Sequence, residues 1–531
     1  MCAGTNPETG LTSPLEDFTH DHIFDSFLSW LEKREEAPWH LIVAGDLFDY
    51  QQVTELPSLG ELKRFRIPVY HDDLDRSRLR NSKLPRKSVY HYEDFIAASI
   101  TDLSPMWSLK TRVEGLGTEE EAVLFKTHRI IEGHMQFFQA VARFIAAGNA
   151  MTILRGNHDV ELAWESSQEL IRERCAEFIP AKKDVILNAL HFYPSFYYEK
   201  DMLYVEHGQQ AEGTTAIRHV YTPFIKPGKS PGRVIELDFS SFLVRYLMNR
   251  VENINPLADN IRPRKNYFIW LIREHPAQAI WIVAAVLPKV VKLWKKFTTP
   301  PGVEESALEN NQRMKEIAEQ LNIPESAASA VDSLKDPPTL PRGWWYMTGM
   351  IAAAAGIKAV AVALIVALLA GLVYVSGIIS GLIDLSSYWY NLVSVVRWIV
   401  VYIGIPLAVL LPILYVLGRR SERKTYTRSP IETGPSPGFR SYASKINKAL
   451  KENNAPVKFI VTGHTHYGDR FDIEQGVRYF NTGTWMFLLN PKEQVFREKF
   501  TYSFVEIING EGALRQFDPA TVTARDMVIE L

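Results

Sequence analysis

The sequence predicts an α/β fold that is interrupted by a pair of membrane-spanning helices. Three observations lead to this prediction. Four short apolar runs end directly in polar residues with metal-binding side chains, an amphipathic helix is expected near the N-terminus, and two long stretches lack any charged residue. The 531 residues suffice for roughly two to four domains with a buried core.

The charge of the chain is close to balanced. It has 59 Lys and Arg residues against 61 Asp and Glu residues, a formal net charge of -2. This balance offers no bulk attraction to nucleic acid, so no nucleic-acid partner is expected. With 46% hydrophobic and 23% charged residues, the composition also excludes an intrinsically disordered chain. Cys2 and Cys175 are too few for a disulfide scaffold or a zinc knuckle, and we expect reduced thiols in a cytosol-like compartment.

The first element expected is a helix over about residues 20–34. Its apolar residues recur with the spacing of one helical face. They are Ile23, Phe24, Phe27, Leu28 and Leu31. The segment ahead of this helix, MCAGTNPETG, has neither the basic nor the apolar region of a cleavable signal peptide.

Four apolar runs are expected to form β-strands, and each ends in residues of metal-binding types. The four are HLIVAGDLFD (40–49), MTILRGNHD (151–159), MLYVEHG (202–208) and KFIVTGHTH (458–466). Loops that follow neighbouring strands bring their side chains together at one edge of a sheet. A glycine in each loop lets the backbone turn sharply and approach an ion. These glycines are Gly45, Gly156, Gly208 and Gly463.

The metal ligands predicted from these loops combine carboxylate, amide and imidazole groups. They are Asp46, Asn157, His207, His464 and His466. Because the set contains no thiolate, it suits Mn, Fe or Zn in a catalytic site better than a structural zinc. Two ions about 3.5–4 Å apart can clamp the attacking and leaving oxygens of a phosphoryl displacement, and Asp46 is the natural bridging group.

The ordered series GD-x-x-D, GNHD, a strand-borne His-Gly and GH-x-H resembles the calcineurin-like metallophosphoesterase superfamily. The resemblance covers residues 1–212 and 440–531, and NTGTW (481–485) also fits it. It implies a four-layer α/β sandwich in which two β-sheets are flanked by helices. It further implies two divalent ions, Mn, Fe or Zn, whose bridging hydroxide attacks a phosphomonoester, phosphodiester or pyrophosphate.

The resemblance also implies which ion each predicted ligand binds. It places Asp46 between the two ions as a shared ligand. Asn157, His207 and His464 then serve one ion. His466 serves the other.

The same resemblance implies that three further residues act without binding metal. His158 hydrogen-bonds the phosphate and stabilises or protonates the leaving oxygen. Asp159 orients His158, and Asp49 supports Asp46 or its loop. The catalytic residues expected are therefore His158 and Asp159.

The sequence departs from the family in one important way. The family opens with a strand and an Asp-x-His motif that complete one metal site, and neither precedes GDLFD here. Without them that ion keeps only Asp46 and His466, although three or more protein ligands are usual. We hypothesise that Met1 is an internal start and that the motif lies just upstream. The competing idea is replacement by residues near the first helix, with the candidates Asp17, His20, Asp21 and His22.

Two stretches, residues 359–383 and 398–417, contain no charged residue. About 20 apolar residues cross a bilayer core of ~30 Å, so we predict two transmembrane helices rather than two buried core helices. Basic residues gather outside the pair, namely Arg342, Lys358, Arg419, Arg420, Arg423 and Lys424. By the positive-inside rule, the catalytic domain and both termini of this integral membrane protein are expected to be cytoplasmic.

Residues 277–297 combine a short apolar run with a cluster of lysines. We favour a helix that lies on an anionic membrane surface, anchored by Trp281 and Trp294, over a plain packed helix. Membrane lipids are therefore expected partners. Proximity to the bilayer also makes a lipid or membrane-proximal phosphoester the expected substrate.

The predicted organisation has four parts. They are the N-terminal part of the phosphoesterase domain (1–212), a helical insertion (213–345), the transmembrane hairpin (346–424), and a linker with the C-terminal part of the domain (425–531). A membrane-anchored pseudoenzyme or scaffold with an incomplete metal site is the main alternative. A small transporter component is a poorer fit, because the two spans carry no acidic residue.

Overall fold

The computed structural model describes residues 1–7, 9–226, 232–246, 248–250, 303–338, 437–486, 489–490, 495–496 and 501–527. They belong to one of the two compact units of the chain, formed by Met1–Tyr267, Thr299–Thr339 and Pro430–Leu531. The two predicted spans and the predicted surface helix at 277–297 lie outside the described residues. Among the helices that are described, none has the length and apolar character needed to cross a membrane.

The described residues form a mixed α/β fold, which confirms the predicted class. One sheet has three parallel strands in the order β1 (His40–Val43), β4 (Ala150–Leu154), β5 (Leu190–Tyr193). A second sheet has the order β11 (Gly468–Glu474), β12 (Val477–Thr482), β10 (Phe459–Thr462), β7 (Leu203–Glu206), β6 (Phe196–Glu199). In this sheet β10 runs parallel to β7 and β12, and the edge strands β6 and β11 are antiparallel to their neighbours.

The two sheets share an apolar core. Leu154 at the end of β4 packs in one cluster with Val205 of β7 and Val461 of β10. Each of these side chains is buried. The shared core keeps the two sheets in contact, so the loops that follow their strands can approach one another.

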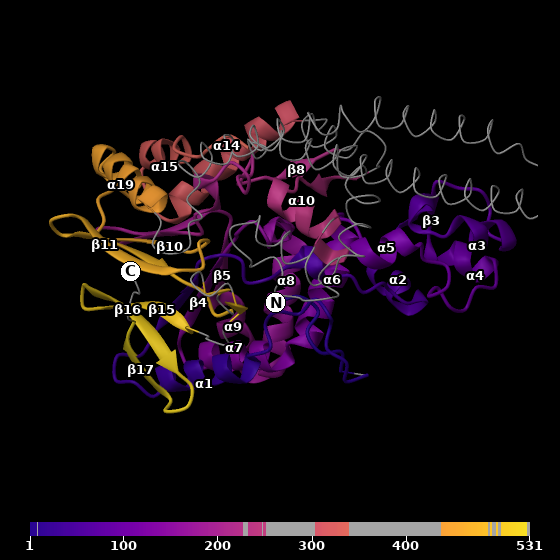
Figure 1. Ribbon diagram of the computed structural model, residues 1–531, viewed down its shortest axis with the longest axis horizontal. Helices are drawn as coiled ribbons and strands as arrows, with labels where there is room; N and C mark the ends of the chain where they lie inside the picture. Colours follow the sequence, from indigo (N-terminus) through magenta and orange to yellow (C-terminus); the bar gives the residue numbers. More distant parts are fainter. Residues whose placement is uncertain are drawn as a thin grey trace, which may run out of the picture. The chain divides into compact units, whose positions relative to one another are not determined.

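Helices pack on both sheets (Figure 1). On the three-stranded sheet lie α1 (Asp21–Glu32), α7 (Met135–Ala146), α8 (Glu165–Phe178) and α9 (Lys183–Ala189). On the five-stranded sheet lie α14 (Val303–Gln320), α15 (Glu325–Asp332) and α19 (Pro437–Glu452). The apolar face predicted for the first helix is the buried face of α1.

A helical lobe is inserted between β1 and β4. It contains η1 (Tyr50–Gln52), α2 (Leu59–Phe65), β2 (Val69–Tyr70), η2 (His71–Asp73), α3 (Arg76–Asn81), β3 (Val89–Tyr90), α4 (Tyr92–Ala97) and α5 (Leu109–Glu114), followed by α6 (Glu120–Gly133). Leu62, Phe95, Trp107 and Phe125 are buried together in its own core. The sequence patterns did not predict this lobe.

The other described elements are short. They are η3 (Val160–Ala163), η4 (Pro180–Lys182), η5 (Gln209–Ala211), β8 (Phe224–Ile225), β9 (Val234–Ile235), α10 (Phe239–Tyr246), η6 (Met248–Arg250), β13 (Leu489–Asn490), β14 (Val495–Phe496), β15 (Ser503–Ile508), β16 (Glu511–Asp518) and β17 (Thr523–Asp526). Strands β15, β16 and β17 form a small antiparallel sheet of their own.

A buried carboxylate ties the N-terminal segment to the start of α7. Glu16 accepts hydrogen bonds from the backbone of Cys2, Gly4 and Phe18 at 2.8–2.9 Å. It also lies 3.0 Å from His134 Nε2, whose other ring nitrogen is 2.9 Å from Asp21. Burial alone raises the pKa of Glu16, but pairing with His134 outweighs it and lowers this pKa. Burial alone lowers the pKa of His134, but pairing with Asp21 and Glu16 outweighs it and raises this pKa.

The Glu16–His134 pair predicts a pH window for stability. Glu16 contributes to the stability of the fold above its unfolded pKa of about 4.3. This stabilisation is lost as the pH falls through the lowered pKa of Glu16 in the folded state. His134 contributes to the stability of the fold below about pH 6.5. This stabilisation is lost as the pH rises through the raised pKa of His134 in the folded state. Replacing His134→Asn should therefore flatten the loss of stability above about pH 6.5, measured as the urea midpoint by circular dichroism.

The control for this experiment is His22→Asn, because His22 is exposed on α1. This variant should keep the pH dependence of the parent chain. A His134→Asn variant with an unchanged pH profile would contradict the pairing. Separately, Glu16→Gln should lower the free energy of unfolding by about 3–5 kcal/mol, because it breaks a buried charged pair.

Candidate metal centre

The four predicted strand motifs bring their loops to one place. The loops that carry Asp46 and Asn157 follow the parallel strands β1 and β4. The loops that carry His207 and His464 follow the parallel strands β7 and β10. Parallel neighbours end at the same edge of a sheet, so each pair of loops emerges together.

Three of the five predicted ligands form one cluster. The potential ligand atoms of Asp46, His207 and His464 all lie within 4.8 Å of one another. Asp46 Oδ2 is 2.9 Å from His207 Nε2, and His464 Nδ1 is 3.3 Å from the same nitrogen. No other group of three His, Cys, Asp or Glu side chains with this geometry occurs in the part of the chain that the structure describes.

The backbone at this cluster is held in conformations that L residues rarely adopt. Asp46 has φ 54°, His464 has φ 67° and His466 has φ 65°. Non-glycine residues in this left-handed region carry strain that is typical of functional sites. The neighbouring glycines are also required, because a Cβ on Gly156 would lie 2.1 Å from Asp46 Oδ1 and one on Gly45 2.6 Å from His207 Nδ1.

Each histidine of the cluster turns one ring nitrogen inward. His207 Nδ1 donates to the carbonyl oxygen of Ala44 at 2.7 Å, which leaves Nε2 facing Asp46. His464 Nε2 lies 3.3 Å from Thr215 Oγ1 and 3.6 Å from Glu212 Oε2, which leaves Nδ1 facing His207. A protein partner on the outer nitrogen is the usual arrangement for metal-binding histidines.

Asn157 supplies the test of whether a cation fits this cluster. Its side chain is 1% exposed, and its Oδ1 atom has no hydrogen-bond partner among the described residues. A buried amide oxygen without a partner is costly. The backbone N–H of the next residue, His158, is bonded to Asp46 Oδ1 at 2.9 Å. The donor set of carboxylate, amide oxygen and imidazole therefore fits a divalent transition metal.

Electrostatics at the cluster also favour a cation. Burial alone raises the pKa of Asp46, but His207 and His158 lower it far below its usual value, so the carboxylate is charged. Burial lowers the pKa of His464 and keeps this imidazole neutral, as a metal ligand must be. Burial also disfavours the charged form of His207, but Asp46 outweighs it and raises the pKa of His207. Protons will therefore compete with the ion at His207.

His158 is paired with Asp49. Its Nδ1 lies 2.7 Å from Asp49 Oδ2, so Nε2 is the nitrogen available to a ligand. Burial alone lowers the pKa of His158, but the carboxylates of Asp49, Asp46 and Asp238 outweigh it and hold this pKa well above its usual value. Asp49 also accepts bonds from its own loop, at the backbone N–H groups of Gln51 and Gln52. These carboxylates favour the protonated form of the His158 imidazole.

The predicted role of Asp159 in orienting His158 stays a prediction, and the hydrogen bonds of its carboxylate in this structure go to backbone groups. The carboxylate of Asp159 accepts hydrogen bonds from the backbone N–H groups of Leu47 and Gly156, at 2.9 and 2.6 Å. It thereby links the loop of Asp46 to the loop of Asn157. Burial and the nearby Asp46 raise the pKa of Asp159 to about 6. The carboxylate that pairs with His158 is Asp49, because the chain turns at the left-handed Asp46 and brings Asp49 back toward His158.

Sequence reasoning missed two residues that support this site. Asp238 directly precedes α10, and its carboxylate accepts from Ser241 N at 2.8 Å. Ser241 Oγ lies 2.9 Å from the carbonyl oxygen of Asn157. Burial raises the pKa of Asp238 to about 7, and the charge of His158 opposes this shift. The available signal was the helix-capping pattern Asp-x-x-Ser at 238–241.

The remaining predicted ligands lie outside the cluster. His466 does not belong to it, although it shares the loop of His464. Asp21 is instead paired with His134, and His20 packs against the ring of Tyr502. Asp17 and His22 are likewise absent from the cluster. The described residues therefore offer one candidate metal position, formed by Asp46, His207 and His464.

Comparison of the chain with models of protein families, with curated proteins and with solved structures finds no match.

Proposed function

We propose that the protein is a metal-dependent phosphoesterase that hydrolyses a phosphomonoester, phosphodiester or pyrophosphate. The observation that carries this proposal is the cluster of Asp46, His207 and His464. The unpartnered Oδ1 of Asn157 adds to it, because the next residue, His158, bonds Asp46 through its backbone N–H. The same loop carries His158, whose pKa is raised by Asp49, Asp46 and Asp238 and whose Nδ1 is paired with Asp49. A cation position next to a proton donor is what cleavage of a phosphate ester requires.

Each side chain has a distinct task in this proposal. A bound divalent ion supplies Lewis-acid polarisation of the phosphoryl group and activates water. His158 donates a proton from Nε2 to the leaving oxygen while Asp49 holds its Nδ1–H. Asp159 keeps the two loops at their spacing by binding the backbone of both. Asp238 and Ser241 support the Asn157–His158 segment from α10.

We also propose the four-layer metallophosphoesterase sandwich for this unit. Two sheets with a shared core and helices on both outer sides support it. The transmembrane hairpin, with the catalytic domain and both termini in the cytoplasm, is proposed from the sequence alone. A substrate near the bilayer follows from that proposal.

The second ion predicted from the sequence stays a prediction. It requires ligands beyond Asp46 and His466, and the described residues form only one cluster. This observation favours a second candidate function, a membrane-anchored pseudoenzyme that binds one ion without turnover. Activity separates the two candidates.

The first test is hydrolysis of p-nitrophenyl phosphate and bis(p-nitrophenyl) phosphate by the full chain after chelation and addition of Mn²⁺, Fe²⁺ or Zn²⁺. We expect chelation to stop hydrolysis and one of these ions to restore it. Asn157→Ala should lower the affinity for the activating ion by about tenfold or more, because it removes a ligand oxygen. The matched control is Asn188→Ala, since Asn188 is exposed on α9. Hydrolysis that is insensitive to chelation would contradict the proposal, and ion binding without hydrolysis would favour the pseudoenzyme.

A further inference from the structure

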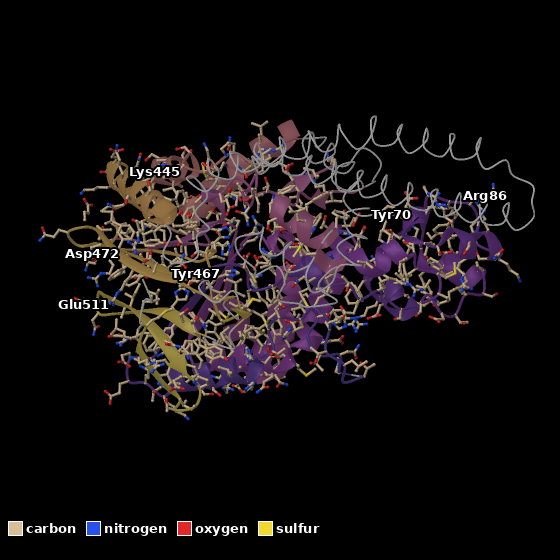
Figure 2. All side chains as sticks on the ribbon, in the orientation of Figure 1. Tyr70, Arg86, Lys445, Tyr467, Asp472 and Glu511 are labelled. Atoms are coloured by element: carbon tan, nitrogen blue, oxygen red, sulfur yellow. The ribbon has the colours of Figure 1, made fainter. Side chains whose placement is uncertain are left out.

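The lobe between β1 and β4 carries a dense set of exposed positive charges. Residues 76–87 hold six basic side chains and no acidic one. All six are exposed. They are Arg76, Arg78, Arg80, Lys83, Arg86 and Lys87. Figure 2 labels Arg86 in this lobe. Because the whole chain has a net charge of -2, this segment is a local excess that the total conceals.

Most of these cations have no acidic partner. Arg76 is 4.0 Å from Asp72, and Lys87 is 2.6 Å from Asp94. Within the described residues, none of the other four lies within 4.0 Å of a carboxylate oxygen. These four side chains form no ion pair within the described residues, so they can bind an external anion.

The positive segment is mounted on a folded scaffold. Leu74, just ahead of the segment, and Leu84, within it, are buried in the core of the lobe, and Leu79 of α3 packs against that core. Strands β2 and β3 pair across the segment, with Val69 opposite Tyr90. The lobe thus presents its cations from a fixed surface, unlike a disordered basic tail.

We propose that this basic surface of the lobe, residues 76–87, binds the anionic headgroups of a phospholipid bilayer. Clustered Lys and Arg side chains attract anionic lipid through the surface potential of the membrane. Two large aliphatic side chains of the same lobe, Ile96 and Leu109, are 49% and 75% exposed, which suits contact with a bilayer. Nucleic acid is the weaker fit, because no exposed large apolar side chain of the described residues is aromatic, and bases need such side chains for stacking.

This inference does not rest on the proposed hydrolysis. It concerns a surface of the α2–α5 lobe, and none of its cations belongs to the candidate metal centre. Hydrolysis of a soluble ester should therefore be unchanged when these cations are neutralised. Failure of catalysis and failure of lipid binding are distinguishable outcomes.

The test measures the distance of the lobe from lipid headgroups. The full chain, labelled with a fluorophore at Ser88→Cys, is mixed with vesicles of phosphatidylcholine alone or with added phosphatidylserine, both carrying a headgroup quencher. Ser88 is exposed beside the basic surface, whereas Cys2 and Cys175 are buried and should not react. We expect strong quenching only with phosphatidylserine, and its loss at high salt.

The deciding variant neutralises the four cations that lack acidic partners, Arg78→Gln, Arg80→Gln, Lys83→Gln and Arg86→Gln. In this variant the phosphatidylserine-dependent quenching at Ser88→Cys should fall by about tenfold or more. A matched control neutralises four exposed lysines elsewhere, Lys182→Gln, Lys183→Gln, Lys445→Gln and Lys448→Gln, and should bind like the parent chain. Figure 2 labels Lys445 on α19. The proposal would be overturned if quenching were equal with both lipids or if both variants gave equal quenching. Displacement of the vesicles by single-stranded DNA would also overturn it.

Discussion

Hydrolysis is expected to fall by about 10²–10⁴-fold when His158 is changed to asparagine, while the affinity for the activating ion stays unchanged. The reason is that, in the proposed mechanism, His158 binds no ion and acts through Nε2, with Nδ1 held by Asp49 at 2.7 Å. The measurement is kcat for an aryl phosphate, together with ion binding by calorimetry. Loss of ion binding in this variant would contradict the role assigned to His158.

The pH profile identifies the carboxylate that controls His158. Because the active form is protonated, activity is expected to decline as the pH rises through the raised pKa of His158. Removing the Asp49 charge lowers that pKa, so in Asp49→Asn the decline should move to lower pH. Asp159→Asn should leave the position of the decline in place, because Asp159 bonds backbone N–H groups instead. If the decline in activity moved to lower pH in Asp159→Asn and not in Asp49→Asn, Asp159 would be the residue that orients His158, as the sequence predicted.

The second large effect is expected at Asp46. Asp46→Asn keeps the shape of the side chain and an oxygen for the bond from His158 N, but it removes the charge beside His207 and His464. Ion affinity should fall by about 100-fold or more, and hydrolysis should fall with it. The measurement is the bound metal content after dialysis against a limiting ion concentration.

The matched control for Asp46 is Asp73→Asn. Asp73 is also partly buried, and burial raises its pKa, but it lies in the lobe and outside the cluster. This variant should bind the ion like the parent chain. If both variants lose metal equally, the loss reflects general unfolding and the assignment of Asp46 fails.

Much of the site could be predicted because strand direction determines where loops emerge. The apolar runs before Asp46, Asn157, His207 and His464 became β1, β4, β7 and β10. Parallel pairing then placed three of these side chains in one cluster. The helical period likewise predicted the buried face of α1. The spacing of apolar residues indicates which face of a helix or strand is buried, so the strands and the buried face of α1 could be predicted from the sequence.

The pairing of His158 could not be predicted from its motif. A motif gives residue types in order, whereas the direction of a side chain depends on the backbone angles of its loop. Asp46 has a left-handed backbone conformation in the GDLFD loop, and Asp49 of this loop contacts His158. The carboxylate of Asp159 accepts hydrogen bonds from backbone N–H groups instead. Asp238 approaches from a segment 80 residues beyond His158, which no local pattern reveals.

The lobe was missed for a different reason. Its helices α2 to α5 have six or seven residues each, which is too short for a clear helical period. Its core residues come from many short elements, such as Leu62 of α2 and Tyr90 of β3. Its positive charge was hidden because the rest of the chain offsets it in the total.

The most direct test of the metal centre is a crystal of the protein soaked with Mn²⁺ and measured near the manganese absorption edge. The account predicts an anomalous peak bounded by Asp46 Oδ2, His207 Nε2, His464 Nδ1 and Asn157 Oδ1. Asp46→Asn crystals treated in the same way should lack that peak. A manganese peak at another position only, or none at this cluster at saturating Mn²⁺, would contradict the assignment.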